Sequence, residues 1–297
     1  RDDDLSVDIR ARGNGYDVVA RGNSFDARSV IKLVTGKDTK PEDASAGTPI
    51  KLQASLKQVT GFHDVRLEQV TAEYASGNGP DRLSIRAATP VFGSVIFARW
   101  TEGGQRQLRL QSENGGAVLR FLNFYRYMEG GKLNLQLAGL NDNALRGRIQ
   151  INDFWVVNEP RLSSLVAASS KSGKPSKSVD VTRVQFGTAF ADIAKGKQRV
   201  DLANGIIRGP TIGFAFQGTL FDEKNNTNMT GTFMPAYGLN RIFGEIPLIG
   251  QILGNGRDRG LIGITFRVVG PFDQPNLEIN PISAIAPGIF RQIFEFD

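Results

Sequence analysis

At residues 261–271 the chain reads LIGITFRVVGP. Ile264, Phe266 and Val268 alternate with polar or small residues, which is the two-residue period of a β-strand with one apolar face. The proline at the end of the stretch lacks a backbone N–H and cannot continue a hydrogen-bonded ladder. The stretch therefore predicts a strand that ends at Gly270-Pro271 and places the chain in a β-rich fold class.

Two amphipathic segments lie on either side of this strand, over residues 239–253 and 282–294. Apolar residues recur in both at three- and four-residue intervals, as on one face of a helix. Pro247 with Gly250, and Pro287 with Gly288, predict kinked or two-piece helices. Such helices suit either a membrane surface or a cap on the end of a sheet, and the periodicity favours neither. The apolar positions are Leu239, Ile242, Phe243, Ile246, Ile249, Leu253, Ile282, Ile285, Ala286, Ile289, Phe290, Ile293 and Phe294.

Upstream, short alternating runs predict strands from Asp4 onward, with Gly13-Asn14-Gly15 as the turn of a first hairpin. The short connections favour an antiparallel meander, and a change of parity near Glu68-Gln69 predicts a β-bulge. Short helices are expected over 24–34, 114–127 and 159–168. Residues 169–178 are rich in Ser, Lys, Gly and Pro, which predicts a flexible linker between a segment 1–168 and a segment 179–297.

These patterns together predict a mainly β protein with short helices. We expect an antiparallel curved sheet, as a groove or an open half-barrel, with amphipathic helices at its C-terminal end. Within it, a face of bulky apolar residues is the candidate binding surface, although the same alternation would describe the buried face of a closed sandwich. The candidate lining residues are Phe214, Phe216, Phe233, Ile264, Phe266 and Val268.

The amino-acid composition narrows the classes of function and partner to be expected. The 297 residues contain no cysteine, one histidine and 36 basic against 30 acidic residues, for a net charge of +6. The basic residues are scattered, so we expect a soluble surface and no nucleic-acid partner, while attraction to anionic lipid headgroups stays open. No window approaches the roughly 18–20 apolar residues of a membrane-spanning helix.

Residues for catalysis are not arranged in any familiar motif. His63 is the one histidine, no Gly-x-Ser-x-Gly or P-loop sequence occurs, and zinc ligands are lacking. The glycine-rich run 254–260 precedes a strand rather than a helix, which disagrees with a dinucleotide fingerprint. We therefore expect neither an enzyme nor a resident metal or cofactor.

The amino-acid sequence of the C-terminal tail also resembles that of a known protein family. The phrases at 246–253 (IPLIGQIL), 268–275 (VVGPFDQP) and 280–288 (NPISAIAPG), with 113–121 (ENGGAVLRF) upstream, resemble the AsmA-like family, closest to its YhdP-like branch in Gram-negative bacteria. The resemblance implies a periplasmic bridge whose long β-groove carries phospholipid between the inner and outer membranes. It also implies an inner-membrane anchor in the full-length protein, so we expect this chain to be a C-terminal portion. Its tail would contact a membrane surface or an outer-membrane partner.

Two functions of different class remain. The first is lipid transfer, in which an apolar strand face replaces water around acyl chains. The second is a β-rich envelope scaffold or adhesion module that binds a protein partner without lipid. The interior distinguishes them, because a scaffold should have a filled, closed core and a transfer module an open apolar channel. We expect the first.

Overall fold

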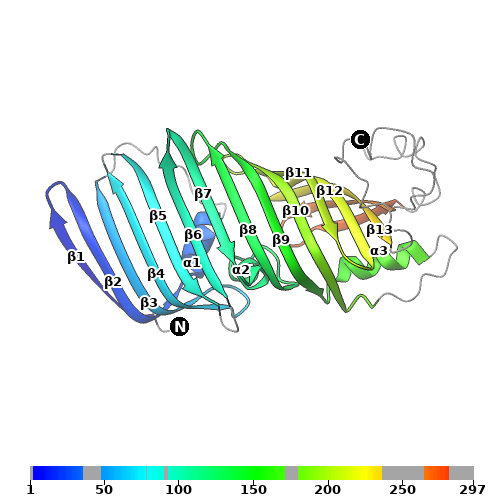
Figure 1. Ribbon diagram of the computed structural model, residues 1–297, viewed down its shortest axis with the longest axis horizontal. Coiled ribbons are helices and arrows are strands. Elements are labelled where there is room, and N and C mark those ends of the chain that lie inside the picture. Colours follow the sequence, from blue (N-terminus) through cyan, green and yellow to red (C-terminus); the bar gives the residue numbers. More distant parts are fainter. Residues whose placement is uncertain are drawn as a thin grey trace. The chain divides into compact units, whose positions relative to one another are not determined.

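The computed structural model describes residues 3–35, 48–77, 79–89, 93–170, 180–235 and 264–280. Its strands form one open sheet in which they follow one another in chain order (Figure 1), so the prediction of a mainly β protein is confirmed. The strands are β1(Asp4–Arg12), β2(Gly15–Asp26), β3(Ile50–Thr60), β4(Arg66–Gly77), β5(Gly79–Ala88), β6(Ser94–Glu102), β7(Gln105–Ser112), β8(Met128–Gly139), β9(Leu145–Val157), β10(Arg183–Lys195), β11(Val200–Arg208), β12(Ile212–Phe221), β13(Asn226–Pro235), β14(Ile264–Pro271) and β15(Asn276–Asn280). The helices are α1(Arg28–Thr35), α2(Gly115–Phe121) and α3(Pro160–Ser170).

Most neighbouring strands are antiparallel, as the short connections predict, but β2 and β3 are parallel. The chain between Asp26 and Ile50 includes α1 and returns to the same end of the sheet, which a parallel neighbour requires. The strands β3–β7 form the antiparallel meander that the sequence predicts, and the parallel pair of β2 and β3 is an exception that it did not predict. The helix predicted from Ser24 begins only at Arg28, because Ser24 still pairs with Gln58 in the sheet.

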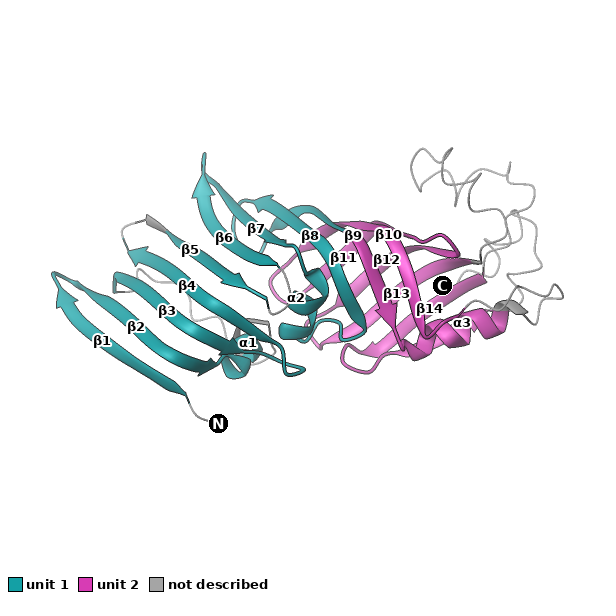
Figure 2. Ribbon diagram, turned by 60° about the horizontal axis from the view of Figure 1, so that its bottom comes forward, with its two compact units in different colours: residues 1–151 teal, residues 152–297 magenta. Residues whose placement is uncertain are grey.

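The chain divides into two compact units, residues 1–151 and 152–297 (Figure 2). We call them unit 1 and unit 2. The division falls within β9 rather than at the Ser- and Lys-rich run 169–178. Residues 171–179 lie outside the described ranges, so the linker expected there stays a prediction.

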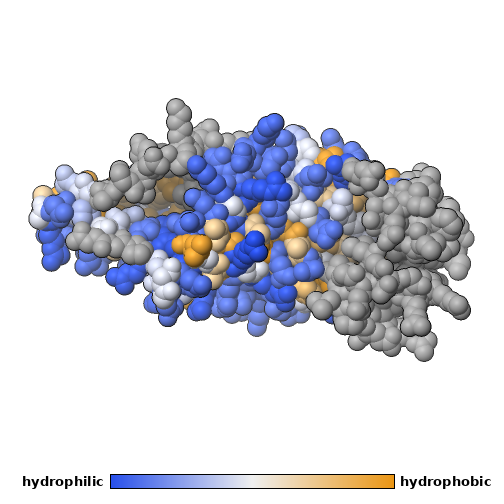
Figure 3. All heavy atoms as spheres, turned by 90° about the horizontal axis from the view of Figure 1, so that it is seen from above, coloured by the Kyte–Doolittle hydropathy of each residue, from blue (hydrophilic) through white to orange (hydrophobic). Residues whose placement is uncertain are grey.

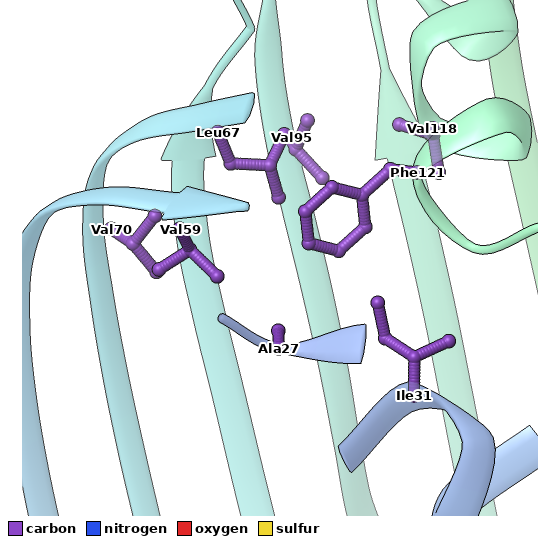
Figure 4. Packing of buried hydrophobic residues seen from close by; sticks show 8 residues of the cluster. All are labelled: Ala27, Ile31, Val59, Leu67, Val70, Val95, Val118 and Phe121. Carbon is purple, nitrogen blue, oxygen red and sulfur yellow. The ribbon is translucent and has the colours of Figure 1, made fainter. Parts of the chain in front are cut away.

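In unit 1 a hydrophobic core lies at one end of the strands, where α1 and α2 pack on the sheet (Figure 4). Ile31 of α1 and Phe121 of α2 meet residues of β3, β4 and β6. Asn114 caps α2, because its side-chain oxygen accepts a hydrogen bond from the N–H of Ala117 at 3.0 Å. The buried members are Ala27, Ile31, Val59, Leu67, Val70, Val95, Val118 and Phe121.

In β3 and β4 the apolar side chains change from even-numbered to odd-numbered positions just before this core. In β3 they pass from Leu56 to Val59, and in β4 from Val70 to Leu67, so each strand turns the next apolar side chain toward the helices. The pairing of β4 with β5 is irregular between Glu68 and Thr71, which confirms the predicted bulge. At a β-bulge the alternation of side chains shifts by one residue, so odd- and even-numbered residues of one strand can point into the same core.

Unit 2 contains α3, close to the helix predicted at 159–168, and the strands β10–β15. β12 and β13 form an antiparallel hairpin, with Phe214 opposite Phe233. β14 ends at Pro271, as its sequence predicts. Helix α3 approaches β13 and β15, and its Leu162 and Leu165 are buried.

The contact between Gly61 and Phe121 predicts a steric effect on stability. A methyl group at Gly61 would overlap the Phe121 ring, which is buried in the core. Gly61→Ala should therefore lower the free energy of unfolding by about 1–3 kcal/mol. Urea unfolding followed by circular dichroism measures this difference.

Gly187→Ala is the matched control, because a methyl group there would have its nearest neighbour at 4.0 Å. It should change stability by less than about 0.5 kcal/mol. Equal effects of the two substitutions would show that the Phe121 contact is not what constrains Gly61.

Candidate functional site

Side chains of unit 1 form three rows that cross β1–β8 on one face of the sheet. Residues directly opposite one another on paired strands point to the same face, so the strand register defines each row. The first row is Ile9, Val18, Leu52, Tyr74, Leu83, Arg99, Leu108 and Leu137. The second row is Val7, Ala20, Ala54, Ala72, Ile85, Phe97, Leu110 and Leu135. The third row is interrupted by the irregular β4–β5 pairing, with Leu5, Gly22, Leu56 and Val70 before it and Ala87, Val95, Ser112 and Leu133 after it.

Apart from Arg99, the first two rows are apolar, and other described parts of the chain do not cover them. Every residue of the second row is apolar and none is buried, and in the first row only Leu137 is buried. At the β1 end, Val7 and Ile9 keep 49% and 65% of their surface exposed. A filled sandwich core would bury such a row. The third row is different, because its Val70 and Val95 belong to the core under α1 and α2.

The opposite face of unit 1 is polar. Arg21 and Arg86 point there, since each sits between two residues of the apolar rows, and so does Arg82, which directly precedes Leu83 of the first row. The sheet of unit 1 therefore has one hydrophilic and one apolar face. Figure 3 shows hydrophobic residues in patches enclosed by hydrophilic ones.

At the strand ends far from α1 and α2, charged residues form the border of the apolar surface. Arg99 lies in the first row between Leu83 and Leu108, and Arg106 lies one step nearer the end, opposite Thr101. These two arginines share two aspartates across three hairpins. We call this set the rim cluster: Asp81, Arg99, Arg106 and Asp142.

Arg106 is the fixed member of the rim cluster. Its side chain is only 5% exposed, and all three of its nitrogens make hydrogen bonds. They reach Asp142 at 2.9 Å, the carboxylate and backbone oxygen of Asp81 at 2.5 and 2.6 Å, and Thr101 at 3.4 Å. Burial lowers the pKa of Arg106, but the hydrogen bonds and negative charges of Asp142 and Asp81 outweigh it, so the pKa is raised.

In unit 2 the register places all six predicted lining residues on one face. Phe214, Phe233 and Ile264 form one row across β12–β14, and Phe216, Gly231 and Phe266 form the next. Val268 follows opposite Met229. The sequence thus identified residues that the fold does bring together.

Their exposure differs from that of the rows in unit 1. Phe233 and Ile264 are 0% exposed and Phe266 is buried, whereas Phe214, Phe216 and Val268 are partly exposed. Ring contacts at 5.2–6.2 Å join Phe214 to Phe233, Phe266 and Phe186. This part of unit 2 has a packed aromatic core, so lipid contact there stays a prediction for the three exposed side chains.

The amphipathic tail segments lie outside the described residues. This holds for 239–253 and 282–294, and so for the choice between a membrane-surface helix and an end cap. Among the helices that the structure does describe, none is long and apolar enough to cross a bilayer.

His63 lies in the turn between β3 and β4, where its Nε2 is 2.8 Å from the side-chain oxygen of Asn123, after α2. This contact joins the turn to the helix end. Within the described ranges, no three His, Cys, Asp or Glu side chains are grouped so as to hold a metal ion.

The rows of unit 1 and the rim cluster were not among the predicted site residues. A signal for both is present in β6, where Val95, Phe97 and Arg99 occupy successive positions of one face. A charge at an apolar position of an alternating strand marks a place where that face meets polar partners. The sequence does not show which residues of the rim cluster pair with one another, because Asp142 is 36 residues from Arg106.

Comparison with known proteins adds no relative. Neither a protein-family model nor a curated protein nor a solved structure matches this chain. The resemblance to the AsmA-like family stays a prediction.

The rim cluster predicts a stability effect. Arg106→Ala would remove the more buried of the two arginines that Asp81 and Asp142 share. Because both aspartates are partly exposed, we expect a loss of about 2–3 kcal/mol in the free energy of unfolding, below the usual range for a fully buried pair. Chemical denaturation measures it, with Arg82→Ala on the polar face as the control. A loss below about 0.5 kcal/mol would contradict a structural role for Arg106.

Proposed function

We propose that this protein shields phospholipid acyl chains on the apolar face of its sheet. In this proposal it forms part of a bridge-like transporter between the inner and outer membranes of a Gram-negative envelope. The observation that carries the proposal is the second row of unit 1, which is apolar throughout and has no buried member. The envelope location rests on the resemblance of the tail phrases alone.

The physical driving force is the removal of acyl chains from water. At about 0.8 kcal/mol per methylene, a chain of about 16 carbons costs on the order of 12 kcal/mol in water. Leucine, isoleucine, valine and phenylalanine side chains in the first two rows replace that water. The rows cross seven inter-strand spacings of about 4.8 Å, or about 34 Å, so they exceed one lipid in width.

No chemical step is needed for this task. A lipid slides from one strand to the next while its acyl chains stay against apolar side chains and its headgroup stays in water. A row without buried members suits this movement, because the lipid meets a continuous surface rather than separate pockets. The net direction requires a source of free energy outside the residues described.

The test is lipid extraction and mass spectrometry of protein purified in mild detergent. Phe97→Asp puts a charge in the centre of the second row and should abolish bound phospholipid, because a carboxylate against acyl chains is strongly unfavourable. Ala98→Asp, the next residue on the same strand, points to the polar face and should leave the lipid in place. Both variants should keep the circular dichroism spectrum of the wild type.

A lipid-free wild-type protein would contradict the proposal and favour the protein-binding scaffold. Phe216→Asp extends the test to unit 2, where Phe216 is partly exposed. Loss of lipid in this variant as well would add the face of β12–β14 to the binding surface.

A further inference from the structure

The apolar rows of unit 1 have the depth of one acyl layer. Along β6, Arg99 is four residues and Thr101 six residues from Val95, which is about 13 and 20 Å at 3.3 Å per residue. Half of the hydrocarbon core of a bilayer is about 15 Å thick. A lipid that lies along the strands, with its chain end at the helix-covered core near Val95, therefore has its headgroup at the rim cluster.

Within the rim cluster, Arg99 differs from Arg106. Its side chain is 27% exposed, and only its Nη2 is within hydrogen-bond distance of a partner, the carboxylate of Asp81. Its Nη1 is 3.7 Å from Asp142, and its Nε has no hydrogen-bond partner. The Nε is buried, so Nη1 is the donor left for a ligand at the border of the apolar surface, and it is suited to a charge-assisted hydrogen bond to a phosphate oxygen.

The neighbouring charges permit such a ligand. Asp81 and Asp142 are each already bound to Arg106, which offsets their repulsion of an anion. With two arginines and two aspartates, the rim cluster has no net charge. The apolar neighbours of Arg99 in the row, Leu83 and Leu108, extend toward the acyl chains.

We propose that Arg99 binds the phosphate of a phospholipid headgroup while the acyl chain of that lipid lies along β5–β7 toward Val95. This inference rests on the proposed function and adds to it a residue that distinguishes phospholipids from lipids without phosphate. The ligand chemistry is a phosphate ester, and its source is a lipid rather than a soluble metabolite.

The experiment compares two fluorescent lipids with the same labelled acyl chains, a phosphatidylethanolamine and a diacylglycerol, in their transfer from phosphatidylcholine vesicles to the protein. The wild type should bind the phosphatidylethanolamine about tenfold more tightly, as expected for one charge-assisted hydrogen-bonded contact. Arg99→Met should remove this preference and retain diacylglycerol binding, because methionine continues the apolar row. Arg99→Lys should keep part of the preference.

Arg82→Met is the matched control, because Arg82 lies on the polar face of the adjacent strand, and it should behave as the wild type. An unchanged preference in Arg99→Met would overturn the assignment of Arg99 and leave the proposed function standing. A wild type that takes up neither lipid would overturn both. Competition by soluble glycerophosphoethanolamine, at concentrations equal to those of the lipid, would assign the site to free phosphate esters instead.

Discussion

The alternation of side chains across the pleat of a strand constrains this molecule more than any other feature. Because paired residues of neighbouring strands point to the same face, a matched register turns alternation within each strand into rows across many strands. In unit 1 this produces an apolar second row from Val7 to Leu135. A slip of one residue in any pair would move polar side chains into that row.

An apolar face is either covered by other side chains or left exposed, and unit 1 does both. The bulge in β4 and the change of parity in β3 direct Val59 and Leu67 toward α1 and α2. The two helices thus close one end of the face over a compact core. At the other strand ends, Arg106 binds two aspartates and gives the face a charged border. The first two rows lie between these limits.

Unit 2 uses the same strand pattern for another purpose. Its rows carry phenylalanine where unit 1 carries alanine and leucine, and the rings of Phe214 and Phe233 pack at 5.2 Å. Larger side chains fill the space above a sheet and exclude each other's surface from water. Phe233 and Ile264 are accordingly fully buried, while Ala54 and Ala72 of unit 1 are not. Side-chain volume is one physical difference between the two faces.

The sequence by itself determined the local elements of this protein. Two-residue alternation predicted the strands, glycines predicted the first hairpin turn, and three- and four-residue spacing located α2 and α3, because each depends on interactions between near neighbours in the chain. It missed the parallel pairing of β2 with β3, since the direction of return across 27–49 is not set by local preference. Only the tertiary structure decided which apolar face stays open and which is closed. The exposure of a residue depends on what packs against it from elsewhere in the chain, as Asp142 does against Arg106. The alternation of apolar and polar residues is the same in an open face and in a closed one.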